Sequence, residues 1–164
     1  MAERDPDLSS RRNYPAYEAD YAAWLEAQAG LMRERRFDEL DLENLLDEVK
    51  SLSLSTYKAF VSAIRVVLIH MLKWDIQEDR RSRSWQNSIE EHRRRVTDEL
   101  NDSPSFAGRV EAALVLAYRQ ARAEAAEETG LPLRRLPKSC PYGWNDVMNR
   151  EHSVIHDPSP KIEV

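Results

Sequence analysis

The feature that most constrains the fold is an apolar stripe that runs from Tyr57 to Trp74 in steps of three and four residues. This spacing places the side chains on one side of an α-helix, whereas a half-buried strand would alternate at every second residue. Because this segment is the most apolar of the chain, we expect a helix over residues 55–75 at the centre of the core. The stripe consists of Tyr57, Phe60, Val61, Ile64, Val67, Leu68, Met71, Leu72 and Trp74.

Other segments repeat the same spacing, and the sequence offers no candidate for a strand. The pattern predicts helices over residues 18–35, 41–52, 84–100 and 103–129, with a short helix over 143–149. The connections between these segments are short, so neighbouring helices are expected to run roughly antiparallel. The predicted fold class is therefore all-α, a single-domain bundle of five main helices plus a short C-terminal helix.

Local chemistry predicts where the helices begin and end. Asp41 is a good cap for the second helix, and Ser103 followed by Pro104 is a strong start for the fifth. Gly130 supplies the residue type that commonly ends a helix. The serines of segment 51–55 compete for backbone hydrogen bonds and predict a break between the second and third helices. The side chains expected to be largely buried are Leu45, Val49, Ile64, Leu68, Leu72, Leu114 and Tyr118.

The ends of the chain are polar, which predicts tails on both sides of one domain. We expect a flexible N-terminal tail over residues 1–13, the helical bundle domain over 14–149 and a flexible C-terminal tail over 150–164. His152 and His156 in the second tail have the i, i+4 spacing of helical metal ligands, but the favoured interpretation is that they hold no native metal.

Composition narrows the class of protein. Of the 164 residues, 41% are hydrophobic and 32% are charged, and the net charge is −5. These values are typical of a water-soluble protein and argue against non-specific binding to nucleic acid or anionic lipid. The longest aliphatic run, residues 66–69, and the polar N-terminus predict neither a membrane span nor a secretory signal. The single cysteine, Cys140, excludes an internal disulfide and fits a reducing cytoplasm.

Motifs of the common enzyme classes are absent from the sequence. There is no glycine-rich phosphate loop, no G-x-S-x-G element, no H-E-x-x-H motif and no Glu-x-x-His pair of a di-iron bundle. The weak catalytic candidates are His70, beside the apolar stripe, and Glu48, which could tune its pKa from the acidic second helix. The favoured interpretation is a hydrogen-bonded histidine at the core edge, with Cys140 as a packing thiol. The sequence therefore leans toward a protein that is not an enzyme and has no metal or cofactor.

One basic cluster follows the apolar stripe. Its candidate binding residues are Arg80, Arg81, Arg83, Trp85, Arg93, Arg94 and Arg95. Phosphate or nucleic-acid contact is one interpretation, because arginines bind phosphates and a tryptophan can stack on a base. The favoured interpretation is structural, with Arg81 or Arg83 paired to a carboxylate of the acidic segment 38–48, since guanidinium groups suit carboxylates.

A series of motifs in a fixed order resembles a known family. The motifs are YEADYAAW at 17–24, RFDELDLENL at 36–45, HMLKW at 70–74, RSRSW at 81–85, SPS at 103–105, ETGLP at 128–132 and CPY at 140–142. Over about residues 14–149 they resemble the bacterial domain-of-unknown-function family numbered twenty-nine. The resemblance implies an all-helical fold, and it implies no reaction, ligand or catalytic residue. The family often has Met-Gly where this chain has Leu52-Ser53, which favours more continuous second and third helices here.

The leading functional hypothesis is a cytoplasmic helical module that binds another protein in an accessory or regulatory role. Its surface is expected on the fourth helix, whose apolar face is thin, and replacing Arg93, Arg94 and Arg95 by Ser is expected to leave folding nearly unchanged. The alternatives are nucleic-acid binding through residues 80–85 and a cryptic enzyme or small-ligand site around His70. No membrane partner is expected.

Overall fold

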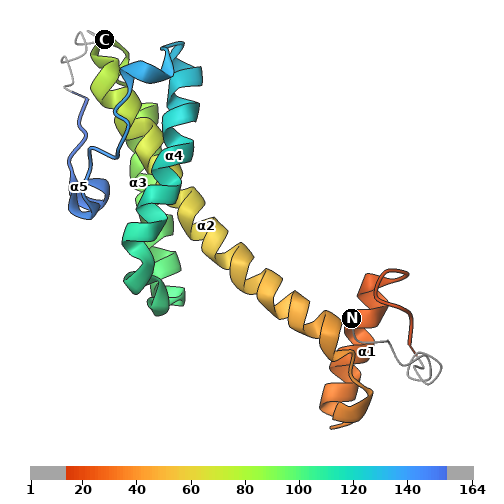
Figure 1. The fold of residues 1–164 in the computed structure, drawn as a ribbon. Coiled ribbons are helices and arrows are strands. Elements are labelled where there is room, and N and C mark those ends of the chain that lie inside the picture. Colours follow the sequence, from red (N-terminus) through yellow and green to blue (C-terminus); the bar gives the residue numbers. More distant parts are fainter. Residues whose placement is uncertain (1–13, 155–164) are drawn as a thin grey trace, which may run out of the picture. The chain divides into compact units, whose positions relative to one another are not determined.

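The computed structural model describes residues 14–154, and every regular element within that range is helical. The chain divides into two compact units, unit 1 up to Leu54 and unit 2 from Ser55 onward. The all-α prediction is confirmed. The α-helices are α1 (Tyr21–Arg33), α2 (Leu42–Ile76), α3 (Arg83–Asp102), α4 (Val110–Thr129) and α5 (Trp144–Asn149) (Figure 1).

The expected break at residues 51–55 is wrong, because α2 runs without interruption from Leu42 to Ile76. No glycine or proline occurs in this range, and each serine costs a helix less than about 0.7 kcal/mol relative to alanine. The second and third expected helices are therefore one helix. The chain has Ser53 where the family it resembles often has glycine. The more continuous helix that this difference predicts is confirmed.

Unit 1 is a helical hairpin made by α1, a 3₁₀ turn at Phe37–Glu39 and the first part of α2. Asp20 caps α1 by accepting a hydrogen bond of 3.0 Å from the Ala23 amide. The turn after α1 includes Arg35, whose φ of 62° lies in the left-handed region that closes a helix end. The buried residues of this unit are Trp24, Gln28, Leu31 and Asp41.

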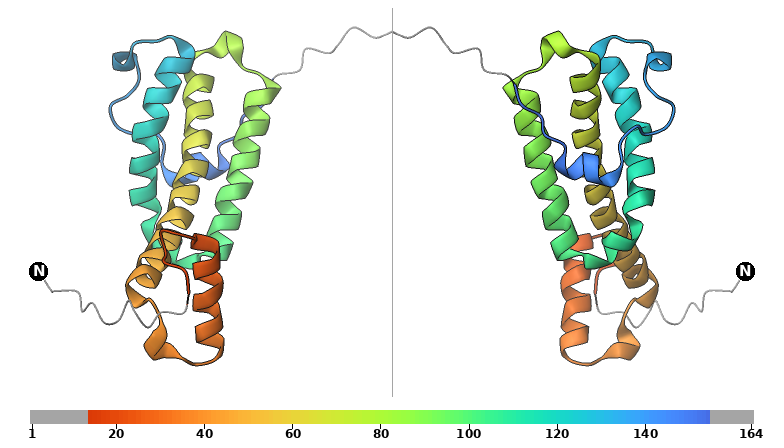
Figure 2. Two further views of the ribbon diagram at one scale, coloured as in Figure 1. Left: turned by 90° about the vertical axis from the view of Figure 1, so that its right-hand side faces the viewer. Right: turned by 90° about the vertical axis from the view of Figure 1, so that its left-hand side faces the viewer.

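Unit 2 is a bundle in which α3 and α4 lie alongside the second part of α2 (Figures 1 and 2). The apolar stripe of α2 forms its centre, where Ile64 and Leu68 are fully buried. Ile89 and Val96 pack onto it from α3. The side of α4 that faces the core is rich in small side chains, which let its backbone approach closely: Ala113, Ala117, Ala121, Ala125 and Ala126.

The predicted capping residues are found at the ends of α3 and α4. Ser82 caps α3 by accepting a hydrogen bond from the Trp85 amide at 3.4 Å. Ser103 and Pro104 precede a 3₁₀ helix, Pro104–Arg109, and α4 follows that helix. Gly130, with a φ of 69°, ends α4 as its residue type predicts.

The segment after α5 packs against unit 2, whereas the sequence predicted a flexible tail from residue 150 onward. Arg150 pairs with Asp75 at 2.5 Å. His152 is buried, and its ring lies edge-on to Trp74 with 5.3 Å between ring centres. The ion pair of Arg150 with Asp75 and the buried His152 ring anchor this segment. The predicted tail therefore begins too early. The predicted tail 1–13 and residues 155–164, which include His156, lie outside the described residues.

Burial agrees with the sequence pattern in unit 2 and departs from it in unit 1. The expected core residues Ile64, Leu68, Leu72, Leu114 and Tyr118 are at most 5% exposed. In unit 1, Leu45 is half-buried and Val49 is 64% exposed, so their assignment to the core was wrong. Helical spacing identifies an apolar face but does not say which element covers it.

Among the described residues, α2 is the one helix long and apolar enough to cross a membrane. This criterion uses length and composition alone, and the core helix of a soluble protein also satisfies it. Of the most apolar window of α2, 44% is buried inside the protein. The short aliphatic runs in the sequence therefore do not exclude a span, although the helix also serves as the core of unit 2.

Candidate functional site

Glu48, one of the weak catalytic candidates, is bound by two tyrosines of unit 1. The Tyr21 hydroxyl donates to Oε2 at 2.8 Å, and the Tyr17 hydroxyl donates to Oε1. The hydrogen bond to the carboxylate raises the pKa of Tyr17 to about 12, so this hydroxyl stays protonated at neutral pH. The structure thus brings Glu48 to these tyrosines and not to His70, and its carboxylate ties α2 to the start of α1.

A second polar cluster in unit 1 centres on the buried Asp41. Trp24 Nε1 donates to Asp41 Oδ2 at 3.3 Å, and the Asn44 side-chain amide donates to the same oxygen at 2.9 Å. The Asp41 backbone amide donates to Gln28 Oε1 at 2.9 Å. These bonds hold the start of α2 against α1, so Asp41 has a structural role.

His70 lies on α2 in unit 2, at the edge of the core. Burial, reinforced by the charge of Lys73, lowers its pKa to about 4, so the ring is neutral at physiological pH. Its Nδ1 atom is buried and makes no hydrogen bond. Glu128 and His92 are the other charged or titrating groups that act on it. The ring is neutral and half-buried, and its Nδ1 lacks the hydrogen bond that the favoured interpretation of the sequence expected.

Arg81 and Trp85 of the basic segment are engaged within unit 2. Arg81 Nε donates to the Trp74 carbonyl at 2.9 Å, and its Nη2 lies 3.4 Å from a carboxylate oxygen of Glu78. Lys73 Nζ lies 4.7 Å from the centre of the Trp85 ring. The cation therefore covers one face of the Trp85 ring.

The carboxylates of the acidic segment 38–48 bind groups of unit 1. Arg36 binds Glu39 through two nitrogens at 2.6 and 2.7 Å, and Glu48 accepts the two tyrosine hydroxyls. Arg81 binds Trp74 and Glu78 within unit 2, and the expected pairing of Arg81 or Arg83 with this segment stays a prediction. Arg80 and Arg83 are exposed.

Arg93 has a structural role, which contradicts the expectation that the arginines of α3 form one dispensable surface. Its Nε donates to the Val147 carbonyl at 2.6 Å, and its Nη2 donates to the Asp146 carbonyl at 3.1 Å. Both carbonyls lie near the C-terminal end of α5, and that of Asp146 also accepts a hydrogen bond of 3.1 Å from the Arg150 amide. Burial lowers the pKa of Arg93. Arg94 and Arg95 are exposed.

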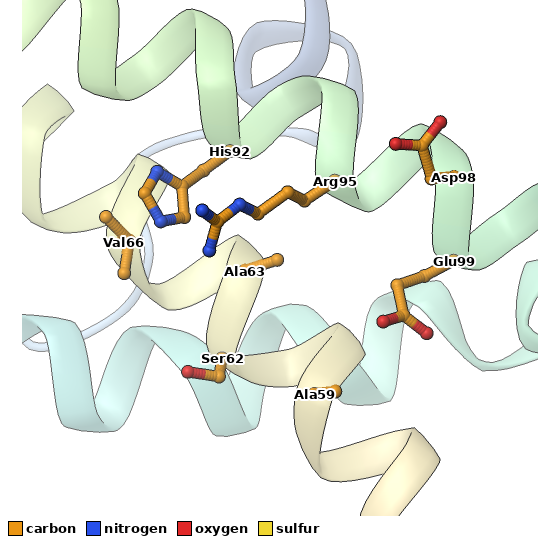
Figure 3. Close-up of a pocket in the computed structure, with 8 residues that line it drawn as sticks. All are labelled: Ala59, Ser62, Ala63, Val66, His92, Arg95, Asp98 and Glu99. Carbon is orange, nitrogen blue, oxygen red and sulfur yellow. The ribbon is translucent and has the colours of Figure 1, made fainter.

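A cleft of about 410 Å³ opens between α2 and α3 within unit 2 (Figure 3). His92 and Arg95 extend from α3 toward small residues of α2, and Asp98 and Glu99 follow further along α3. The lining residues are Ala59, Ser62, Ala63, Val66, His92, Arg95, Asp98 and Glu99.

The polar groups of the cleft carry both signs of charge and are partly occupied. His92 Nδ1 lies 2.9 Å from the Ser88 carbonyl, which assigns the proton to Nδ1 and leaves Nε2 as an acceptor. Arg95 pairs with Glu91 at 2.5 Å, and the Ser62 hydroxyl accepts a hydrogen bond from an arginine of α2. Arg95 and the Ser62 hydroxyl of the lining therefore already have partners within the protein.

The first part of α2 carries a regular face of exposed apolar side chains. We call the residues Leu42, Leu45, Leu46, Val49 and Leu52 the unit 1 stripe. Leu45 is half-buried, and the other four are between 54% and 69% exposed. At 3.6 residues per turn these five side chains cover an arc of about 120°. Single exposed leucines are ordinary, whereas a contiguous apolar face marks an interaction site.

The sequence predicted a helix over residues 41–52 but placed Leu45 and Val49 of the unit 1 stripe in the core, and it gave no indication of the cleft. The signal it lacked for the stripe was the number of helices that pack against this part of α2. For the cleft, His92, Arg95 and Asp98 recur at steps of three on α3. That spacing indicates one helix face, although the sequence does not show a groove beside it.

Comparison with known proteins identifies a family but assigns no role to any residue. Residues 16–153 match a family model described as Domain of unknown function DUF29. No curated protein matches the chain, and no solved structure matches it. Within residues 14–154, no three His, Cys, Asp or Glu side chains are grouped so that they could hold a metal ion.

Proposed function

The chain belongs to the family described as Domain of unknown function DUF29, which brings no activity with it, and we propose that it is a protein–protein interaction module. Its docking surface is the unit 1 stripe. The observation that carries this proposal is the exposure of Val49, at 64%, and of Leu52, at 69%, within a regular apolar face. Such a face is costly in water and is stabilised when another protein covers it.

The small size of unit 1 supports the proposal. Residues 14–54 form a two-helix hairpin whose buried apolar side chains are Trp24 and Leu31. Units of about 40 residues rarely bury enough apolar surface to be stable without a disulfide, a metal or a partner chain. Covering the stripe would add burial worth about 25 cal/mol per Å².

Nucleic-acid binding receives less support from the basic segment. Trp85 has Lys73 over its ring, and Arg81 is held by Trp74 and Glu78. A site that reads single strands needs open aromatic faces next to free cations. We therefore rank protein binding above nucleic-acid binding.

Site-specific photo-crosslinking in living host cells tests the proposal. A photoreactive p-benzoylphenylalanine is placed at Val49, and a matched variant carries it at Ser51, which is also exposed but lies about 160° around the helix. A docking stripe predicts discrete protein adducts at position 49 and few at position 51. Adducts with another copy of the chain count as much as adducts with a different protein.

The contradicting result is equally specific. If positions 49 and 51 give the same pattern, or neither gives a protein adduct while both proteins stay folded by circular dichroism, the unit 1 stripe is not a docking surface. Crosslinking of nucleic acid through residues 80–85 instead would favour the second hypothesis.

A further inference from the structure

We propose that the occupant of the unit 1 stripe is a second copy of this chain, bound with the two α2 segments antiparallel. The inference rests on the proposed function, because it names the partner of the same surface. Three features of residues 42–52 support it. They are the pairing of apolar side chains between two copies of the stripe, the placement of the charges beside the stripe, and the apolar area that it exposes.

The stripe is complementary to itself about a two-fold axis near Asp47. In an antiparallel pair centred there, Leu42 of one copy lies level with Leu52 of the other, and Leu45 lies level with Val49. These layers each join two aliphatic side chains, whereas Leu46 lies level with Glu48 of the other copy. Helix–helix interfaces are commonly built from such layers of apolar side chains, which are spaced three and four residues apart along each helix.

Charged side chains at the edge of the stripe favour the antiparallel arrangement. Glu43 and Lys50 lie on the same edge, about 20° apart around the helix. In the antiparallel pair, this edge of one helix lies against the same edge of the other helix, and the two helices run in opposite directions. Glu43 of each copy therefore lies next to Lys50 of the other. A parallel pair brings opposite edges together and makes neither contact.

Lys50 is available for this pairing. Its Nζ lies 3.5 Å from Asp47 Oδ1, and the two side chains are 65% and 69% exposed. An ion pair this long and this exposed contributes little to stability. Lys50 can therefore reorient toward a second copy at small cost.

The exposed apolar area of the stripe fits a weak, reversible dimer. Fully burying a large aliphatic side chain removes about 60–120 Å² from water, judged from 1.5–3 kcal/mol at 25 cal/mol per Å². With their exposed fractions taken into account, the five side chains of the stripe offer on the order of 300 Å² per copy. Two copies bury about 600 Å² of apolar surface, so the dimer should be weak and should dissociate on dilution.

The charges around the stripe do not favour a membrane surface as the occupant. Glu43 and Glu48 flank the stripe on its two edges, against the single Lys50. Helices that lie on anionic bilayers carry lysine and arginine on their polar face. A second copy, which brings both Glu43 and Lys50, fits the charges better.

Sedimentation equilibrium of the full chain, from low to several hundred micromolar, tests the inference. The parent should pass from monomer to dimer as concentration rises. Val49→Glu places a charge in the middle of the contact and should raise the dissociation constant by about tenfold or more. The matched control, Ser51→Glu, adds the same charge on another side of α2 and should change the constant less than about twofold.

A charge exchange tests the antiparallel geometry. Glu43→Lys and Lys50→Glu should each weaken the dimer about threefold to tenfold, because each places like charges together. The double variant restores both pairs and should dimerise like the parent. If the double variant is as weak as the sum of the single variants, the proposed antiparallel pairing is wrong.

Failure of the inference and failure of the proposed function can be told apart. A parent that stays monomeric throughout, or a Val49→Glu variant that dimerises like the parent, overturns self-association. If crosslinks at position 49 then reach a different protein, the proposed function stands with another partner. Flotation of the parent, but not of Val49→Glu, with phosphatidylglycerol vesicles would show that a bilayer is the occupant and would overturn both proposals.

Discussion

Arg150 and Asp75, far apart in the sequence, form a two-pronged ion pair in unit 2. Arg150 Nη2 lies 2.5 Å from Oδ1 and Nη1 lies 2.8 Å from Oδ2, and the Tyr142 hydroxyl donates to the same Oδ2 at 2.8 Å. Burial acts to raise the pKa of Asp75, but the hydrogen bonds from Arg150 and Tyr142 outweigh it and lower the pKa. The pair fastens the segment after α5 to the end of α2.

Replacing Arg150 with Ala should lower the free energy of unfolding at neutral pH by about 1 kcal/mol, because each side chain is about one third exposed. The folded pKa of Asp75 lies below its unfolded value of about 3.9, so its contribution is present above that value. The contribution is lost as pH falls through the folded pKa. Urea unfolding should therefore show a difference between parent and variant that shrinks in acid.

Arg150→Lys is the matched control for this pair. It keeps the charge and loses the two-pronged geometry, so it should fall between the parent and Arg150→Ala. A difference that is as large in acid as at neutral pH would contradict the assignment to Asp75.

Arg93→Ser should destabilise the protein by about 1–3 kcal/mol, because it removes the two hydrogen bonds that tie α3 to the Val147 and Asp146 carbonyls of α5. Arg94→Ser, next to it on α3 and exposed, should stay within about 0.5 kcal/mol of the parent. Urea midpoints of the two variants measure the contrast. Equal midpoints would show that Arg93 is as dispensable as its neighbour.

Leu68→Ala should cost about 2–5 kcal/mol, because Leu68 is fully buried at the centre of unit 2. Val115→Ala, on the exposed side of α4 at 68% exposure, is the control and should be nearly neutral. Thermal unfolding of both variants gives the comparison. A Leu68→Ala protein as stable as the control would place the core elsewhere.

His70 should titrate near pH 4 in the folded protein, below the value of about 6.5 for an unfolded chain. Because the unfolded state then binds more protons, stability is complete above about pH 6.5 and falls as pH drops toward 4. Nuclear magnetic resonance of the ring measures the pKa, and His70→Gln should flatten the pH dependence in this window. A ring that titrates near 6.5 would contradict its burial.

The fold of unit 2 could be predicted from the sequence because the apolar faces that helical spacing indicates are the faces that neighbouring helices bury. The stripe from Tyr57 to Trp74 is buried by α3 and α4, and Ser82 and Gly130 mark helix ends by side-chain and backbone chemistry. The pairing of Arg150 with Asp75 could not be predicted, because nothing local in either segment specifies the other.

Unit 1 shows where helical spacing stops being informative. Val49 has the same spacing relative to its neighbours as Leu68 has, yet it is 64% exposed while Leu68 is fully buried. The serines at 51–55 also suggested a break, although the helix propensity of serine is too close to that of its neighbours to force one. Which apolar face remains open depends on how many helices pack there, and this is a property of the whole fold.

Thiol labelling tests most directly whether the unit 1 stripe is a contact surface between copies. In a Cys140→Ser background, Val49→Cys keeps a small apolar side chain at the centre of the stripe, and Ser51→Cys is the control on another side of α2. Self-association predicts that labelling at position 49 slows as protein concentration rises, while labelling at position 51 does not. Equal rates at both positions, unchanged at every concentration, would contradict it.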